Sequence, residues 1–583
     1  MTPAHPAPVH GRRPLPRTLA ATAALALAVT AAGPATAAPT HDRPTPPGQA
    51  QRTAPAAQQG GGKGGPHAAS PDAEDLAPQL ADQELAWEDC GFEAPAGPDA
   101  AAPALDAPGL ACADVEVPLD WDSPEDGRTI TVRISKVPAS DPAARQGIMM
   151  INPGGPGGPG LEMAPYLADS APEVAAAYDM IGFDPRGVGR STPLTCQVPS
   201  EAMMSQDPAT GPRAIADACR AEPLAPFITT EQTVHDMDLI RAVLDEDQTS
   251  YLGYSYGTWL GSWYQRTFPQ NAGRFVLDSS TDLTRKSLEE TWDLQPYAFE
   301  RQFAQVLLPY AARHGEQYGL SGTAEDLYRQ FEEAGGTRTE TGQLVGMILA
   351  QLMYSADNYP VAAELLAAYL NGELDDAAGL GDAVAQAGLD ARLAGVDPRL
   401  ADALEDVPGE GAPGEEELPE YLPFAGAMPA IQCQDGRWQH STGYWQAQRD
   451  KLARTAPFAG GLFSALPVCA FWPATEEMPK PGNHKTHPET LILQSEMDPA
   501  TDYAGGARSA KLLPNTTLVS VDDEVSHGVY PYGSACVDDV VERYLLTGER
   551  PRRNVVCQGH ALPGDDAPME YDGGVRAEAA RRG

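Results

Sequence analysis

After residue 40 the 583-residue sequence has no apolar run near the length of about 18 residues that a transmembrane helix needs. Positive charge is also scarce, because 40 lysines and arginines face 81 aspartates and glutamates, a formal net charge of −41. Such a chain repels nucleic acid and anionic membrane surfaces. We therefore expect no nucleic-acid partner and no stable membrane association.

The N-terminal residues have the pattern of an export signal. Arginines precede the uncharged run 18–32, and residues 35–37 offer an A-x-A cleavage site. We expect cleavage near Ala37 or Ala38 and release of a secreted product. Residues 38–82 are dominated by Pro, Gly, Ala, Gln and Ser, so they are predicted to be a flexible linker or pro-segment.

No C-x-x-C motif occurs, which gives zinc-binding or thioredoxin-like chemistry little support, and no metal or cofactor is expected. The chain does contain eight cysteines, and an even number in an exported protein predicts disulfides. Sequential pairing is the simplest of 105 possible connectivities. The pairs are then Cys90 with Cys112, Cys196 with Cys219, Cys433 with Cys469, and Cys536 with Cys557.

Strand-like and helix-like stretches alternate over residues 83–286. Strand patterns lie at 113–119, 129–137, 147–152, 177–183 and 274–278, and a helical pattern covers 231–244. This alternation indicates the α/β class, with a mostly parallel sheet covered by helices.

Between residues 287 and 422 the alternation stops. Ala, Leu and Glu recur there at helical spacing and no convincing strand appears, so this region is predicted to be an inserted helical cap. The second part of the core is expected over 423–562, with strands at 490–494 and 516–521. Residues 563–583 are polar and are expected to form a loose tail.

The segment Gly253-Tyr-Ser-Tyr-Gly257 fits G-x-S-x-G, the nucleophile elbow of α/β-hydrolases. In that motif a serine occupies a sharp strand-to-helix turn, and the glycines let strand and helix pass closely around it. A short β-prone stretch precedes Ser255, and a helical pattern follows it as far as Pro269. The context predicts an α/β-hydrolase fold with Ser255 as its nucleophile.

A serine nucleophile needs a histidine to take its proton and a carboxylate to orient that histidine. In α/β-hydrolases both follow the serine, with the acid first. Of six histidines after Ser255, His527 lies on a loop after a strand and leaves room for an acid before it. Asp498, which is also just past a strand, is the expected acid. The alternatives are Glu496, Asp502 and the more distant Asp278.

The oxyanion formed in acyl transfer needs two preorganised backbone N–H donors. One is expected from Tyr256, the residue after the nucleophile, and the other from the glycine–proline loop 153–160. Gly155 is the preferred donor in this loop and Gly154 is the alternative. The loop also fits the dinucleotide pattern G-x-G-x-x-G, but its prolines lack the N–H groups that a phosphate cradle uses.

Five segments follow one another along the chain: N-P-G-G-P-G at 152–157, G-F-D-P-R-G-V-G-R-S at 182–191, G-Y-S-Y-G-T at 253–258, A-I-Q-C-Q-D at 430–435 and C-A-F-W-P at 469–473. Together they resemble the secreted bacterial tripeptidyl aminopeptidases, which are α/β-hydrolase serine exopeptidases related to prolyl aminopeptidases. The resemblance runs from about residue 87 to 557. It implies a cap over the catalytic face, the triad Ser255, Asp498 and His527, and attack on peptides with a free N-terminus.

The chain departs from the related patterns at three places. Pro153 stands where prolyl aminopeptidases carry the histidine of H-G-G-P-G, as is usual in the tripeptidyl branch. Ser279 replaces the glycine of a frequent V-L-D-G, and residues 299–314 lack a cysteine of many relatives.

We expect a secreted serine aminopeptidase that releases tripeptides through an acyl-enzyme. The alternatives are an esterase or lipase of the same fold and a binding protein without catalysis.

Overall fold

The computed structural model describes residues 72–92, 107–374, 419–473, 477–572 and 574–575. The expected signal peptide and most of the expected linker lie outside these residues. Within the described ranges, no helix combines the length and the apolar character of a membrane span.

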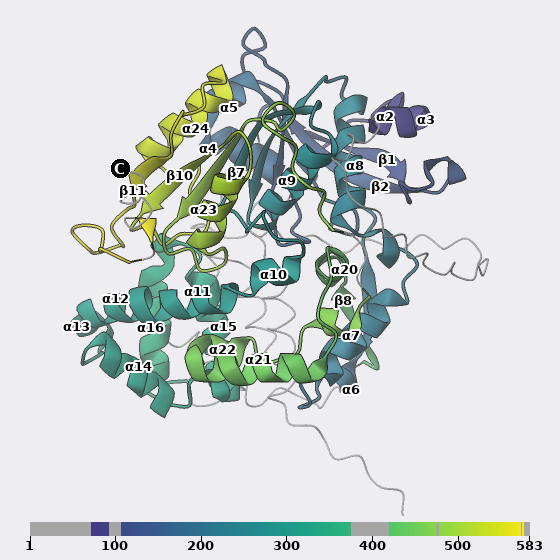
Figure 1. The fold of residues 1–583 in the computed structure, drawn as a ribbon. Coiled ribbons are helices and arrows are strands. Elements are labelled where there is room, and N and C mark those ends of the chain that lie inside the picture. Colours follow the sequence, from purple (N-terminus) through teal and green to yellow (C-terminus); the bar gives the residue numbers. More distant parts are fainter. Residues whose placement is uncertain (1–71, 93–106, 375–418, 474–476, 573, 576–583) are drawn as a thin grey trace, which may run out of the picture.

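In the described part of the chain, nine strands form one central sheet (Figure 1). They are β1 (Ala111–Pro118), β2 (Thr129–Val137), β3 (Ile148–Asn152), β4 (Asp179–Phe183), β6 (Thr249–Tyr254), β7 (Ala272–Asp278), β9 (Thr490–Ser495), β10 (Thr516–Asp522) and β11 (Val555–Gln558). Their order is β1-β2-β4-β3-β6-β7-β9-β10-β11. Strand β2 pairs antiparallel with both neighbours, and every other pair is parallel. The predicted mostly parallel sheet is confirmed.

Helices cover both faces of the sheet, which explains why its central strands are buried along their whole length. Every residue of β3, β6 and β9 is buried. One face packs against α8 (Thr230–Val243), α9 (Tyr256–Thr267) and α23 (Tyr503–Leu512). The other packs against α4 (Met163–Ser170), α5 (Pro172–Ala177) and α24 (Ala535–Thr547). Neighbouring strand residues such as Tyr251 and Leu252 therefore belong to different clusters.

A helical cap follows β7 and has its own apolar core. Its helices are α10 (Leu288–Trp292), α11 (Gln295–Gln302), the π-helix η3 (Phe303–Leu307), α12 (Leu308–Arg313), α13 (Gly315–Tyr318), α14 (Ala324–Glu333), α15 (Glu340–Leu352) and α16 (Tyr359–Leu370). Phe303 belongs to this core and stacks on Phe458 with the ring centroids 4.0 Å apart. Between residues 287 and 374 all described elements of secondary structure are helices.

A second sheet of two strands joins the end of the range 287–422 to an earlier segment of the chain. Strand β8 (Tyr421–Ala425) pairs antiparallel with β5 (Thr195–Pro199), which α6 (Ser200–Met203) and α7 (Thr210–Arg220) follow. The expectation of no strand before 422 is therefore wrong at its last residues, because the partner of β8 lies over 200 residues earlier in the sequence.

Three helices lie between β8 and β9, namely α20 (Ala427–Gln434), α21 (Thr442–Thr455) and α22 (Pro457–Leu462). Phe458 of α22 belongs to the cap core. We therefore infer that the cap continues past residue 422 and ends before β9.

Both ends of the described chain are packed rather than loose. Helices α2 (Ala73–Leu76) and α3 (Pro78–Ala81) lie against α8, and the Ala73 N–H donates to Asp238 Oδ2 at 2.9 Å. Residues 72–82 are thus not a flexible linker. At the other end, Tyr571 and Val575 are buried, and the Tyr571 N–H donates to Asp523 Oδ1 at 2.7 Å. The predicted loose tail is therefore wrong for the described residues after 562, because buried carboxylates hold their backbone.

All four disulfides follow the predicted sequential pairing: Cys90–Cys112, Cys196–Cys219, Cys433–Cys469 and Cys536–Cys557. The second bridge joins β5 to α7, the third joins α20 to the turn η6 (Val468–Phe471), and the fourth joins α24 to β11. Each bridge closes a short loop within one part of the fold.

A buried ion pair explains the arginine of G-F-D-P-R-G. Arg186 is fully buried and binds the Asp236 carboxylate through Nε and Nη2 at 2.7 and 2.5 Å. Its guanidinium also donates to the carbonyl oxygens of Pro118, Leu119 and Phe227. The arginine therefore ties the end of β1 to α8.

We predict that Arg186→Met lowers the free energy of unfolding by about 3–5 kcal/mol, because it leaves the Asp236 carboxylate buried without its cation. Urea denaturation measures this change. The matched control is Arg128→Met, which removes the exposed pair with Asp126 and is expected to cost less than about 1 kcal/mol. Equal losses in the two variants would contradict the assignment.

Candidate active site

Ser255 occupies the turn between β6 and α9, as the elbow pattern predicts. Its backbone has φ 55° and ψ −122°, a left-handed region that is costly for a residue with a side chain. A Cβ on Gly253 would lie 2.5 Å from the Gly257 carbonyl oxygen, and one on Gly257 would lie 2.8 Å from the Asn152 carbonyl oxygen. Both flanking positions are therefore restricted to glycine by contact.

Asp498 lies just past β9 and is completely buried. Its Oδ1 accepts the backbone N–H groups of Ala500 and Thr501 at 2.8 and 2.7 Å, and its Oδ2 accepts the Thr501 hydroxyl at 3.0 Å. The imidazole Nδ1 of His527 lies 2.9 and 3.0 Å from the two oxygens. The structure thus brings the expected acid and base into direct contact.

The contact shifts the pKa of both groups. Burial alone raises the pKa of Asp498, but attraction to His527 and the hydrogen bonds to the carboxylate outweigh it, so that the pKa is lowered. Burial lowers the pKa of His527, but the Asp498 carboxylate outweighs it, and the imidazole pKa is raised above its ordinary value. Each group therefore stabilises the charged form of the other.

The loop that carries His527 turns sharply at Gly528, whose φ is +89°. The Gly528 N–H donates to Ser279 Oγ at 2.7 Å. The next two N–H groups, of Val529 and Tyr530, donate to the buried Asp278 carboxylate at 3.0 and 2.9 Å. The loop is thereby fixed to the end of β7, beside the elbow.

The three alternative acids have other contacts. Asp278 accepts those loop N–H groups, and burial raises its pKa to about 6. Glu496 accepts the N–H groups of Asp523 and Val575 at 3.0 and 3.1 Å. Asp502 caps α23 and pairs with Arg301 at 3.0 Å. Of these four carboxylates, all within the described residues, Asp498 is the one that hydrogen-bonds to the His527 ring.

The glycine–proline loop lies against the elbow. A Cβ on Gly154 would lie 2.5 Å from the Tyr254 carbonyl oxygen and 3.2 Å from the Tyr256 nitrogen. The Gly154 N–H already donates to Asn152 Oδ1 at 3.0 Å. This contact favours Gly155 over Gly154 as the donor from this loop.

Asp184 lies 24 residues after Gly160, close to the spacing of the acid in a dinucleotide site, but its contacts are structural. It is buried and accepts the N–H groups of Gly160 and Arg190, both at 2.8 Å. The carboxylate therefore fixes the end of the glycine loop.

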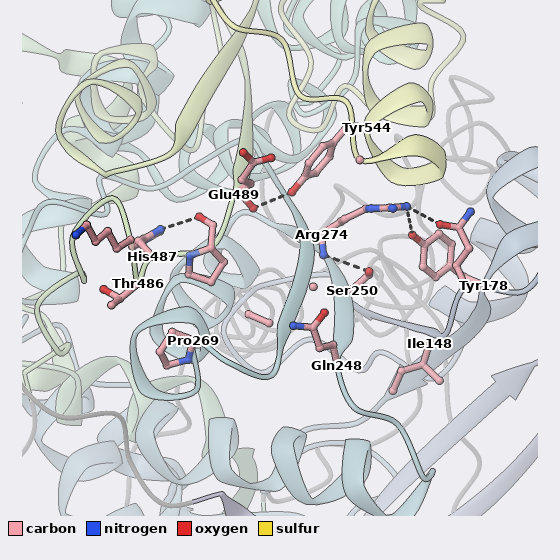
Figure 2. A pocket seen from close by; sticks show the side chains of 16 residues that line it. Ile148, Tyr178, Gln248, Ser250, Pro269, Arg274, Thr486, His487, Glu489 and Tyr544 are labelled. Atoms are coloured by element: carbon pink, nitrogen blue, oxygen red, sulfur yellow. Dashed lines mark hydrogen bonds between the residues drawn. The ribbon is translucent and has the colours of Figure 1, made fainter.

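A cavity of about 460 Å³ lies at the N-terminal ends of the central strands, whereas Ser255 lies at their C-terminal ends (Figure 2). Ile148, Ser250 and Arg274 line it from the first residues of β3, β6 and β7, whereas Ser255 follows the last residue of β6. Within it, the Arg274 guanidinium donates to Tyr178 Oη at 2.9 Å and to Gln146 Oε1 at 2.6 Å. This cavity is distinct from the site around Ser255.

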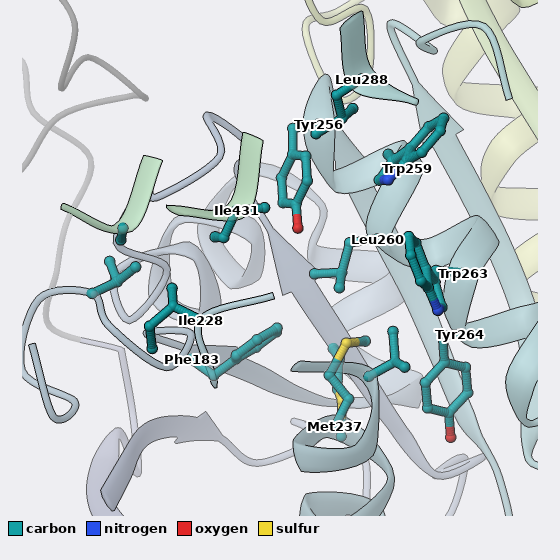
Figure 3. Close-up of a cluster of buried hydrophobic side chains, with 14 of the residues drawn as sticks. Phe183, Ile228, Met237, Tyr256, Trp259, Leu260, Trp263, Tyr264, Leu288 and Ile431 are labelled. Carbon is teal, nitrogen blue, oxygen red and sulfur yellow. The ribbon is translucent and has the colours of Figure 1, made fainter. Parts of the chain in front are cut away.

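Sequence reasoning missed a polar network behind the elbow helix. Asp435, the last residue of A-I-Q-C-Q-D, is completely buried and accepts Trp259 Nε1 at 3.1 Å. Thr230 Oγ1 contacts both the Asp435 carboxylate and the Tyr256 hydroxyl. Tyr256 and Trp259 pack in the core cluster of Figure 3. Burial raises the pKa of Asp435 to about 7. The motif is visible in the sequence, but its distance of about 180 residues from Ser255 hides the contact.

Sequence reasoning also missed two cap residues. Tyr354 follows α15, and its carbonyl oxygen accepts the His527 N–H at 2.8 Å while its ring meets the imidazole edge to face at 5.0 Å. Gln302, at the end of α11, donates to carbonyl oxygens in the loops of both Asp498 and His527. No local pattern marks either residue, because Tyr354 accepts through its backbone carbonyl and Gln302 resembles other polar residues at helix ends.

Comparison with known proteins gives the family. Residues 147–331 match the model of the α/β hydrolase fold, and residues 456–557 match that of TAP-like proteins. The tripeptidyl aminopeptidase of Streptomyces lividans is 32% identical over 509 residues, 82% of this chain and 87% of that protein.

Two mycobacterial proteins are more distant. The serine protease Hip1 of Mycobacterium tuberculosis (strain ATCC 25618 / H37Rv) is 27% identical over 504 residues, 77% of this chain and 87% of its own length. Carboxylesterase B of the same strain is 27% identical over 494 residues, 76% and 86% of the two chains. With 32% identity to a tripeptidyl aminopeptidase over 82% of its length, the chain belongs to the tripeptidyl aminopeptidase family and is a serine hydrolase of the α/β-hydrolase fold.

Proposed function

We propose that the protein is a secreted aminopeptidase that releases tripeptides from peptides with a free N-terminus. The observation that carries the proposal is the buried contact between Asp498 and His527 on loops beside the Ser255 elbow. The name of the relative from Streptomyces lividans supports the peptide substrate. Four disulfides and the N-terminal signal pattern support export, since disulfides persist in oxidising compartments.

In the proposed mechanism Ser255 attacks the peptide carbonyl carbon while His527 takes its proton as general base. Asp498 holds the imidazole through Nδ1 and stabilises the imidazolium that forms. The N–H groups of Tyr256 and Gly155 hold the oxyanion. His527 then gives the proton to the leaving amine, and water hydrolyses the acyl-enzyme by the same route in reverse order.

The substrate ammonium group needs a carboxylate partner. Cap helix α10 carries Glu290, which lines a hollow of about 10 Å³ together with Ala500, Thr501 and Asp502. That volume holds about one water-sized group, and an ammonium group is of this size. Asp502 is paired with Arg301, whereas Glu290 makes no ion pair within the described residues. We therefore favour Glu290 as the anchor of the N-terminus.

An esterase is the second candidate, because Carboxylesterase B is among the relatives. The same nucleophile and oxyanion donors serve ester hydrolysis. The two activities differ in whether a free ammonium group on the substrate matters.

A fluorophosphonate probe is expected to label the wild-type protein, and Ser255→Ala is expected to abolish labelling because the probe reacts with an activated serine. Gel fluorescence and mass spectrometry of the labelled peptide measure this. The control is Ser321→Ala, which removes an exposed serine between α13 and α14 and keeps the label. Failure of the wild type to react would refute the assigned nucleophile.

Asp498→Asn is expected to lower kcat by about 10⁴-fold, because the imidazole loses its orientation and the stabilisation of its charged form. The base must be neutral, so wild-type kcat/KM falls as the pH drops through the raised pKa of His527. Removing the carboxylate moves this acid limb to lower pH. The pH dependence of kcat/KM measures the shift.

The control for that experiment is Asp502→Asn on the same loop, since asparagine keeps the cap of α23. It is expected to leave the acid limb in place. An unchanged limb in Asp498→Asn would contradict the assignment of the acid.

A tripeptidyl anilide with a free N-terminus is expected to be cleaved with a kcat/KM about 10–100-fold above that of its N-acetylated form, because a charged hydrogen bond contributes about 1.5–3 kcal/mol. Glu290→Gln should raise KM for the free substrate and leave the acetylated one unchanged. Equal turnover of the two substrates, with fast cleavage of a nitrophenyl ester, would favour the esterase instead.

A further inference from the structure

Gln302 joins the cap to both loops of the acid–base pair. It is completely buried, and its Nε2 donates to the carbonyl oxygens of Met497 at 3.1 Å and Val525 at 2.7 Å. Met497 directly precedes Asp498, and Val525 lies two residues before His527. One amide group therefore spans the two loops whose separation sets the contact between carboxylate and imidazole.

The position of this amide is set by the cap. Gln302 is the last residue of α11, and the π-helix η3 begins at the next residue. Phe303 of η3 is buried in the cap core, stacked on Phe458 and 5.0 Å from the Phe331 ring. Short π-helices are frequent at functional sites, because the wider turn redirects a side chain. The side chain thus leaves a buried cap core and reaches the loops of Asp498 and His527.

Burying the side-chain amide of Gln302 also costs free energy of folding. Its Oε1 is buried without a hydrogen-bond partner among the described residues. An apolar side chain of the same volume would avoid that cost, but it would leave the two carbonyl oxygens without the shared donor. The donor function therefore explains why an amide occupies this position.

Further cap contacts reach the same loop. The His527 N–H donates to the Tyr354 carbonyl oxygen at 2.8 Å, and the Ala356 N–H donates to Ser526 Oγ at 3.1 Å. With the Gln302 contact to Val525, cap residues hold three consecutive positions, 525, 526 and 527. The loop that orients the base is therefore held by the cap as well as by the sheet.

We propose that Gln302 is a positioning residue that couples the cap to the acid–base pair. It holds the loops of Asp498 and His527 at one separation, so that a displacement of α11, such as one caused by a peptide entering beneath the cap, changes the contact between imidazole and carboxylate. This inference rests on the proposed roles of Ser255, Asp498 and His527. It assigns to the cap a part in catalysis besides the exclusion of large substrates.

Gln302→Met tests the coupling, because methionine keeps the length and bulk of the side chain and removes both donors. We expect kcat on a tripeptidyl anilide to fall by about 100-fold, the effect of a misplacement of about 1 Å, with a smaller change in KM. We also expect the acid limb of kcat/KM to move to lower pH, as the imidazole loses part of its contact with the carboxylate. The titratable groups facing the imidazole are Asp498, Asp278 and Tyr354.

The matched control is Gln295→Met. Gln295 begins the same helix, and its Nε2 donates to the Ala500 carbonyl oxygen at 3.2 Å, so it contacts the acid loop without reaching the histidine loop. This variant should keep the wild-type acid limb. Equal losses in both variants without a shift of the limb overturn the proposal, because they indicate a general packing effect.

Gln302→Glu provides a second variant if the methionine variant does not fold. Glutamate is nearly isosteric, has no donor when ionised, and regains one O–H donor when protonated. The ratio of variant to wild-type activity should therefore rise as the pH falls. Wild-type activity at high pH, where the glutamate is ionised and has no donor, overturns the proposal.

The fluorophosphonate reaction separates this inference from the proposed function. A wild type that is labelled at Ser255, together with a Gln302→Met variant of unchanged rate and pH profile, overturns the coupling alone. A wild type that does not react overturns the proposed function and the coupling with it.

Discussion

A carboxylate without access to solvent, paired with an imidazole, is the interaction on which the arrangement of this site depends. Asp498 is fully buried, and a buried charge is tolerated only when it is paired and hydrogen-bonded. Its partners are His527 and the backbone and hydroxyl of the turn at Thr501. The loops after β9 and β10 therefore converge over the elbow, and the cap closes above them.

The cap contributes to this arrangement as a structural part. Its apolar core around Phe303 and Phe458 is separate from the two cores of the sheet. Its polar contacts with the sheet domain include those to the histidine loop, through Gln302 and Tyr354. A cap whose apolar cluster includes Met497 and Val525 of the two catalytic loops can transmit its own displacement to them. Binding beneath the cap and proton transfer at His527 are then physically linked.

The elements that could be predicted are those with a local signal. The strands β2, β3 and β9 have continuous or alternating apolar patterns, and the elbow has a motif whose glycines are required by contact. The sequential disulfides were predictable because each one closes a short loop. The pairing of β5 with β8 was not, since more than 200 residues separate these two short strands.

The sequence by itself determined the fold class, the position of the elbow serine and the order of its expected partners, because periodicity and a strained glycine-flanked turn are local properties. Only the tertiary structure decided which carboxylate meets His527, which residues hold the two loops and how the chain ends pack. Asp278, Glu496 and Asp498 all lie at or just past the ends of strands, so their positions in the sequence are nearly equivalent. The directions of the three carboxylate side chains differ. Each direction depends on a backbone N–H donor, from Val529, Asp523 and Thr501 respectively. Only folding brings the loops of these donors together.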